Sequence, residues 1–196
     1  MLLHAPASLD ELLLLFAPCF TKPTFQTFRA LVLGQVSQTR LRCVTGMLTG
    51  ARLSAVCHHA RARRFFSDAR GCVDELSLTV AELIAERLRA PGQSLTVPID
   101  DTLLRRRGSR TFATGWHHDA TANSRRGTVA WGNNWVMAGI NVELPFLERT
   151  VCLLVAFRLR RPRRREIPKH KSDPERPSKR RLARQILRLP RACRPA

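Results

Sequence analysis

Two adjacent carboxylates, Asp100 and Asp101, follow the apolar run 94–99. The run predicts a buried strand, and a buried carboxylate is costly unless a cation or hydrogen-bond donors meet its charge. One common solution is a divalent metal ion, because Mg²⁺ takes one or two protein carboxylates and leaves positions for phosphate and water. The pair therefore indicates either a metal site of the kind used in phosphoryl transfer, or a turn or cap, which is the commoner role of an aspartate at a strand end.

An arginine-rich turn comes directly after this pair. Guanidinium groups suit phosphate contacts, so the arginines of this turn either contact phosphate or form a solvated turn. Its cations are Arg105, Arg106, Arg107 and Arg110.

Two further polar groups lie in the segment that follows. His117, His118 and Asp119 are expected in the loop between the first two strands, where they either bind a metal, position DNA or hydrogen-bond within the loop. Asn133 and Asn134 are expected in the turn into the second strand, and the alternative is a base or sugar contact.

A basic helix is predicted over residues 54–66. Arg61, Arg63 and Arg64 would lie against DNA in a helix-turn-helix-like domain, or would form a solvated helix face. His58 and His59 are not expected to share a metal ion, because adjacent side chains on a helix point about 100° apart.

Hydrophobic periodicity places these residues in an α+β chain with a helical part at residues 1–90. Helices are predicted from Ser8 to the residue before Pro18, from Pro23 onward, and over residues 54–66 and 73–88. After Pro91 and Gly92 the pattern changes. The predicted strands cover residues 94–99, 135–142 and 150–157, which form an antiparallel meander in a domain over residues 91–160, and a basic linker and helix occupy 161–196.

The composition predicts a polyanionic partner. The 196 residues carry a net charge of +19, and 44% of them are hydrophobic, which excludes a simple disordered cationic tail. Residues 158–196 hold 16 basic and three acidic residues. This tail contains no aromatic residue, which argues against the stacking of single-stranded bases on it.

The cysteines and the apolar runs argue against a zinc-binding, a disulfide-stabilised and a membrane-spanning protein. Six cysteines include no CxxC pair, so neither a zinc ribbon nor a disulfide framework is expected. The apolar run 12–20 is too short to span a bilayer and follows Asp10 and Glu11 instead of positive charge. We expect a cytoplasmic protein with no membrane or small-molecule partner.

An ordered series of motifs carries a resemblance to a known family. The sequence resembles the DDE-superfamily endonucleases of bacterial insertion-sequence transposases, in their N-terminal portion. The motifs are FTKPTFQTFRALVLG (20–34), VTGML (44–48), RRFFSDARG (63–71), VPIDDTLLRRRG (97–108), GWHHD (115–119), GNNWVMAGINVELPFL (132–147), VCLLVAFRL (151–159) and PERPSKRRLAR (174–184).

The resemblance implies an N-terminal helical DNA-binding domain and a ribonuclease-H-like domain. Such enzymes cut and join double-stranded DNA at element ends, with Mg²⁺ or Mn²⁺ held by an Asp, Asp, Glu triad. The first triad aspartate corresponds to Asp101, with Asp100 left open. A bacterial, nucleoid-associated location follows from the same resemblance.

One departure from the family pattern changes the expected activity. The second Asp and the Glu of the triad lie in the family beyond the helix that begins here near Ser178, and no acidic residue follows Glu175. We therefore expect a truncated ribonuclease-H-like domain, with three strands and a helix. Because one aspartate cannot hold two metal ions, metal binding is doubtful and strand transfer by this chain is not expected.

Two further hypotheses come from other functional classes. One is a non-catalytic DNA-binding module that pairs with full-length transposase and inhibits it. The other is a basic RNA-binding protein of ribosomal type, which accounts for the charge but not for the ordered motifs.

If the basic tail contacts DNA, binding is expected to be weakly sequence-specific and steeply salt-dependent. The logarithm of the association constant should fall by about 0.9 for each neutralised phosphate per decade of salt. Fluorescence anisotropy with a labelled duplex over a salt series measures this slope. A slope near zero, or strong preference for one random duplex over another, would contradict the expectation.

Overall fold

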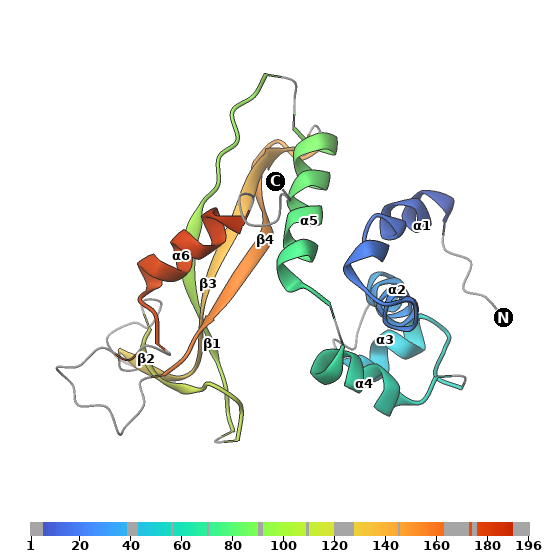
Figure 1. Cartoon of the computed structure of the whole chain (residues 1–196), viewed down its shortest axis with the longest axis horizontal. Helices are drawn as coiled ribbons and strands as arrows, with labels where there is room; N and C mark the ends of the chain where they lie inside the picture. Colours follow the sequence, from blue (N-terminus) through green and yellow to red (C-terminus); the bar gives the residue numbers. More distant parts are fainter. Residues whose placement is uncertain are drawn as a thin grey trace. The chain divides into compact units, whose positions relative to one another are not determined.

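The computed structural model of the chain separates into two compact units, Met1–Thr79 and Val80–Ala196, which we describe one at a time (Figure 1). The structure describes residues 6–38, 43–55, 57–69, 71–89, 92–108, 110–119, 128–144, 146–162, 173 and 176–189. Among these residues, no helix is both long and apolar enough to cross a membrane.

The first unit is helical. Its elements are α1 (Ala7–Leu14), a short 3-10 helix η1 (Ala17–Cys19), α2 (Lys22–Ser37), α3 (Val44–Gly50), α4 (His59–Asp68) and the start of α5 (Val73–Arg87). Pro23 lies in the first turn of α2, where its fixed φ is compatible with a helix and its missing N–H costs nothing. The Nδ1 atom of His58 accepts a hydrogen bond from the backbone N–H of Ala60 and so caps α4.

The core of this unit joins α2, α3 and α4. Leu31, Leu48 and Ala62 are almost fully buried against one another, with Phe65 packed on them. The Phe65 ring also lies 6.4 Å from that of Phe28, which stacks on Phe20 at 4.8 Å. Because Ala62 forms the inward face of α4, the other side of that helix is free to carry cations.

The second unit contains an antiparallel sheet. Its strands are β1 (Ile99–Arg105), β2 (Gly115–His118), β3 (Val129–Glu143) and β4 (Thr150–Arg160). Gly132 pairs with both Arg105 and Gly115, and Trp135 pairs with both Thr102 and Leu159. Strand β3 is therefore central, with β1 along one edge and β4 followed by β2 along the other.

Two helices cover the sheet. In the second half of α5, Ile84 packs on Ile140 and Val142 of β3. Helix α6 (Lys179–Leu187) lies across β3 and β4 (Figure 1). Leu182 and Ile186, one turn apart, are its buried residues.

Most of the predicted elements are confirmed. The helices expected after Pro23, over residues 73–88 and from Ser178 are present as α2, α5 and α6, and the α+β class and antiparallel strands are as expected. The helix predicted over 54–66 begins only at His59. Ser8 does not cap α1, because that helix begins at Ala7, after Pro6.

The strand predicted over residues 94–99 was placed too early. Pro98 has no N–H to donate to a ladder, so the preceding segment makes only isolated bonds, from Asn141 N to Thr96 O and from Gly139 N to Pro98 O. Regular pairing starts at Ile99. Asp100 and Asp101 therefore lie inside a strand and not after its end.

Two other predictions for this region were wrong. The segment with His117 and His118, expected as a loop, is strand β2, because β3 begins at Val129 and offers it a pairing edge. Asn133 and Asn134, expected in a turn, are buried in the middle of β3. Of the six cysteines, five lie in the described residues and all five are free, as predicted; Cys193 lies outside them.

The close approach of α2 and α3 gives a stability test at Gly34. A Cβ atom there would collide with the backbone of Met47, 2.6 Å from its carbonyl carbon. Alanine favours an isolated helix by about 1 kcal/mol, yet Gly34→Ala should destabilise the protein by about 1–3 kcal/mol because overpacking dominates. Urea unfolding followed by circular dichroism measures this. Val36→Ala, at an exposed position of the same helix, is the matched control, and a stabilised Gly34→Ala would contradict the packing.

Candidate functional site around Asp101

Asp101 lies in the middle of a polar network on the covered face of the sheet. One oxygen of its carboxylate accepts hydrogen bonds from the Asn134 side-chain amide at 3.0 Å and from Lys179 Nζ at 2.6 Å. These partners come from β3 and from the first turn of α6. The neighbouring Asp100 is exposed, and its carboxylate accepts a hydrogen bond from the backbone N–H of Asp101 at 2.7 Å. The two carboxylates are thus separated by strand alternation.

The strand register brings other charged residues to the same face. Arg160 of β4 pairs with Asn134 of β3. His117 of β2 pairs with Ala130, near the start of β3. A cavity of about 390 Å³ opens between these strands and α6. The polar residues that line it are Asp100, Asp101, Thr102, His117, His118, Asp119, Asn134, Arg160 and Lys179.

Asp101 is held in its charged form. Burial raises the pKa of the Asp101 carboxyl, but the hydrogen bonds from Lys179 and Asn134 outweigh that effect, and the pKa lies below its usual range. The side chain of Asp101 is 31% exposed, so the site is open to a ligand and partly screened by water.

His117 is held in its neutral form. Burial lowers the pKa of its imidazole, and the positive charges of Arg160, Arg176 and Lys179 lower it further. The residue is 6% exposed. An added anion in the cavity would offset the neighbouring cations.

Several buried polar atoms of the cavity lack a partner. His117 Nε2, Asn134 Oδ1 and Arg160 Nε are buried and make no hydrogen bond within the described residues. Buried polar atoms without partners are rare in folded proteins and indicate water or a ligand. Residues that line the cavity therefore carry buried donors and acceptors that a water molecule or a ligand would satisfy.

The arginines that follow Asp101 are not equivalent. Arg105 donates from Nε and from a terminal nitrogen to one oxygen of Asp119, which is 5% exposed. Arg106 donates to the side-chain oxygen of Asn133 at 3.2 Å. Arg107 and Arg110 are exposed. Arg105 therefore neutralises a buried carboxylate, and Arg106, Arg107 and Arg110 lie nearer to solvent.

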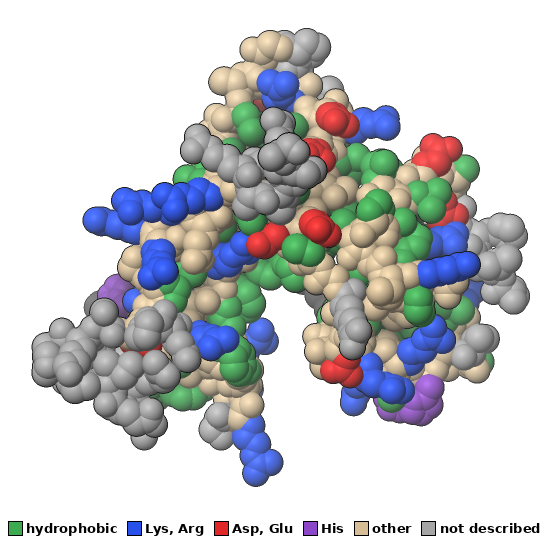
Figure 2. Space-filling model, in the orientation of Figure 1, with side chains coloured by type: hydrophobic (Ala, Val, Ile, Leu, Met, Phe, Trp, Pro, Cys, Tyr) green, Lys and Arg blue, Asp and Glu red, His purple; other side chains and the backbone are tan. Residues whose placement is uncertain are grey.

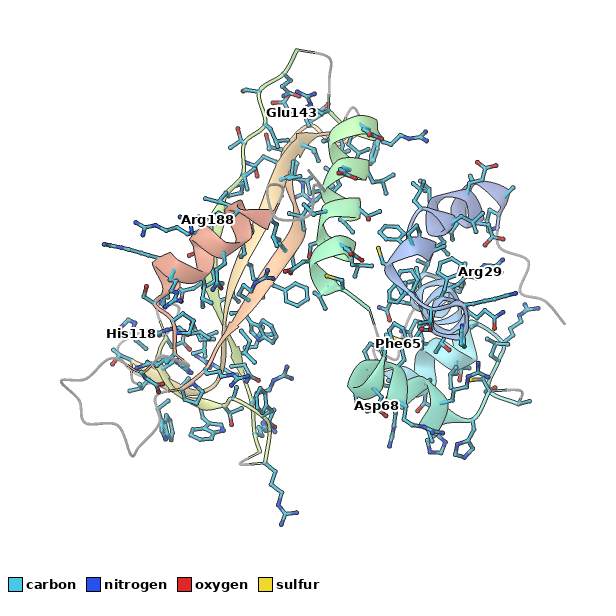
Figure 3. The ribbon with its side chains drawn as sticks, viewed as in Figure 1. Arg29, Phe65, Asp68, His118, Glu143 and Arg188 are labelled. Carbon is cyan, nitrogen blue, oxygen red and sulfur yellow. The ribbon has the colours of Figure 1, made fainter. Side chains whose placement is uncertain are left out.

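The predicted basic helix presents its cations to solvent in the helical unit. Arg61, Arg63 and Arg64 are all exposed on α4. Arg61 and Arg64 line an open groove of about 520 Å³ between α4 and the first turns of α2, whereas Arg63 does not. Figure 3 labels Phe65 and Asp68 on this helix, and Figure 2 shows basic side chains protruding from each unit.

The sequence analysis singled out Asp101, His117 and His118, which line the cavity, but not Arg160 or Lys179, and it considered Asn134 as a turn residue or a base or sugar contact. Lys179 is 78 residues away from Asp101 and looks like one more cation of a basic tail. Arg160 was counted with the linker, and Asn134 with a turn. Alternation along a correctly bounded β3 and β4 would have placed Asn134 and Arg160 on the face of Asp101.

The described residues do not fit a divalent metal ion. They contain no cluster of three or more His, Cys, Asp or Glu side chains arranged to hold one. The carboxylate of Asp101 is already neutralised by Lys179, and Arg105 neutralises Asp119. Asp100 and His118 also line the cavity, but both are exposed to solvent. The cavity as it stands is a better match for an anion.

The antiparallel sheet, its covering helices and the carboxylate on β1 are compatible with a nuclease-like α+β fold. The sequence model of the DDE superfamily endonucleases matches residues 15–192. The chain belongs to this family, whose members act on DNA and generally use divalent metal ions. No curated protein and no solved structure matches the chain.

The buried histidine gives a pH test. The pKa of His117 is lower in the folded protein than its ordinary value of about 6.5, so its contribution to stability is complete above that pH and is lost on acidification. As the pH falls from about 6.5 toward the lower pKa of the folded protein, the free energy of unfolding should decrease by up to about 1.4 kcal/mol per pH unit. His117→Gln should flatten the slope in urea unfolding between about pH 7.5 and about pH 5.5. His118→Gln, on the exposed face of the same strand, should keep it; an unchanged slope in His117→Gln would contradict the assignment.

Proposed function

We propose that this chain is a double-stranded-DNA-binding protein of the DDE superfamily that acts in DNA transposition, with a DNA phosphate seated in the Asp101 cavity. The observation that supports it most directly is that Arg160 of β4 and Lys179 of α6 both lie beside the carboxylate of Asp101. Arg160 Nε is buried there without a partner, and an anionic phosphate oxygen supplies the acceptor that it lacks.

In this proposal exposed arginines add phosphate contacts within each unit separately. Arg106, Arg107 and Arg110 lie shortly after β1, and Arg61 and Arg64 line the groove of the helical unit. Each would neutralise one phosphate without reading sequence. The DNA would be the ends of an insertion sequence in a bacterial cell.

Cleavage by the described residues alone is not part of the proposal. A family reaction with Mg²⁺ or Mn²⁺ needs several carboxylates, and the cavity offers Asp101 and Asp119, each paired with a cation. The ammonium of Lys179 occupies the position next to Asp101 that a metal ion would need. The chain binds DNA in this proposal and leaves the chemistry to carboxylates from elsewhere.

A regulatory role is the second candidate. Within the described residues β1 pairs only with β3, so its outer edge is open to a strand of another chain. Pairing there with a complete transposase would place an inactive copy in the assembly and inhibit it.

Charge removal at Asp101 tests the phosphate seat. Asp101→Asn removes the negative charge that is paired with Lys179 and should tighten binding of a labelled duplex by about two- to tenfold at low salt. Fluorescence anisotropy measures the dissociation constant. Asp100→Asn removes a carboxylate that also lines the cavity but is exposed and accepts from the Asp101 backbone N–H, so it should have a smaller effect. Arg160→Gln should weaken binding.

Plasmid nicking tests whether the chain cleaves DNA. Supercoiled plasmid incubated with the protein and Mn²⁺ should remain supercoiled. Nicking that disappears in Asp101→Asn would show that the chain is catalytic. Weaker duplex binding by Asp101→Asn would instead overturn the phosphate seat.

A further inference from the structure

Three aromatic side chains lie at the end of the sheet where β1, β2 and β3 meet, on the face away from Asp101. Trp116 alternates with His117 along β2, so it points to the opposite side from the cavity. It lies directly across from Trp131, with ring centroids 5.7 Å apart and planes at 69°. Phe112 precedes β2. Trp116 is 70% exposed and Phe112 is 68% exposed.

Hydrogen bonds fix the Trp131 ring and the backbone that carries Phe112. The indole N–H of Trp131 donates to the Gly108 carbonyl at 3.3 Å. Asn133 is 3% exposed; its amide donates to the Phe112 carbonyl at 2.9 Å, and its oxygen accepts from Arg106. A buried residue of the central strand thus anchors both an aromatic residue and a cation. The Trp131 ring and the Phe112 backbone are therefore in place before a ligand binds, and Trp116 packs edge-on against Trp131.

The surroundings of the rings are cationic. The guanidinium of Arg161 lies 5.4 Å from the centroid of the Phe112 ring. Arg106, paired across from Trp131 through a backbone hydrogen bond, is exposed beside it. Asp119, the acidic residue nearest to Trp116 in the sequence, lines the cavity on the opposite face of the sheet and forms an ion pair with Arg105. Water-exposed aromatic rings among arginines are unfavourable as a bare surface and are characteristic of a binding site.

Exposed aromatic rings beside arginines favour a single-stranded nucleic acid over a duplex. Base stacking on aromatic rings needs bases whose faces are accessible, and arginines near the rings attract the phosphates that connect them. In a duplex the base faces are covered by their neighbours, so a duplex would use only the arginines.

We propose that Phe112, Trp116 and Trp131, with Arg106 and Arg161, form a surface that binds unpaired bases of single-stranded DNA. We call it the aromatic surface. It goes beyond the duplex contact proposed for the Asp101 cavity and lies on the opposite face of the sheet. DNA is chosen over RNA because the family acts on DNA.

The test separates stacking from charge. The full chain is titrated with a labelled oligothymidylate of about 12 nucleotides and with an abasic oligomer of the same length, which has the same phosphates and no bases. The base-bearing oligomer should bind at least about fivefold tighter and should quench tryptophan fluorescence. Trp116→Ala should raise its dissociation constant about five- to 100-fold and leave the abasic oligomer unaffected.

Control variants keep the result interpretable. Phe146→Ala removes another exposed aromatic residue, 78% exposed, from the β3–β4 connection, just beyond Glu143 and at the far end of the sheet from His118 (Figure 3). It should not change either affinity. Trp116→Phe keeps a stacking ring, so it should retain most of the affinity but lose much of the quenching, and circular dichroism checks that each variant is folded.

Three outcomes would overturn the proposal: equal affinity for the base-bearing and abasic oligomers, tighter binding of the corresponding ribo-oligomer, or equal losses in Phe146→Ala and Trp116→Ala. None of them bears on the Asp101 cavity, whose test uses a duplex and different substitutions.

Discussion

The negative charge of Asp101 lies on the covered face of a β-sheet, and the arrangement of the second unit depends on how that charge is balanced. Lys179 reaches it from the first turn of α6, and Asn134 reaches it from β3. Leu182 follows Lys179 by three residues and Ile186 by seven, so the cation and the buried apolar positions share one face of the helix. An ion pair this exposed contributes only about 0–1 kcal/mol. Apolar packing therefore holds α6 on the sheet, while the ion pair determines which groups meet in the cavity.

Strand β3 distributes polar groups to two surfaces. Asn133 and Asn134 are adjacent and almost fully buried, but they point to opposite faces. Asn134 donates to the carboxylate of Asp101, and Asn133 holds Phe112 and Arg106 at the aromatic surface. Each amide satisfies neighbours that a hydrophobic residue would leave without a partner. The central strand is thus a polar scaffold at one end and an apolar core strand at the other, where Ile140 and Val142 pack on α5.

Local patterns predicted what depends on local physics. The periodic apolar positions of α2 and α5 and the Ser178 cap of α6 are visible within a few residues. The position of Lys179 is not, because its contact with Asp101 spans 78 residues and results from how α6 packs. The start of β1 depended on Pro98, whose missing N–H delays regular pairing until Ile99. The pairing partner of β2 likewise lies outside the segment itself.

Both surfaces also depend on a single register between β2 and β3. Gly115 lies opposite Gly132. A Cβ at Gly132 would come within 2.9 Å of the Leu104 carbonyl carbon, and one at Gly115 within 2.9 Å of the Pro162 side chain. Gly132 allows β1 to approach β3 closely, and Gly115 allows the segment after β4 to approach β2. A shift of one residue would turn Trp116 into the cavity and His117 out to solvent. The cavity and the aromatic surface would then be lost together, because consecutive residues of the same short strand contribute to both.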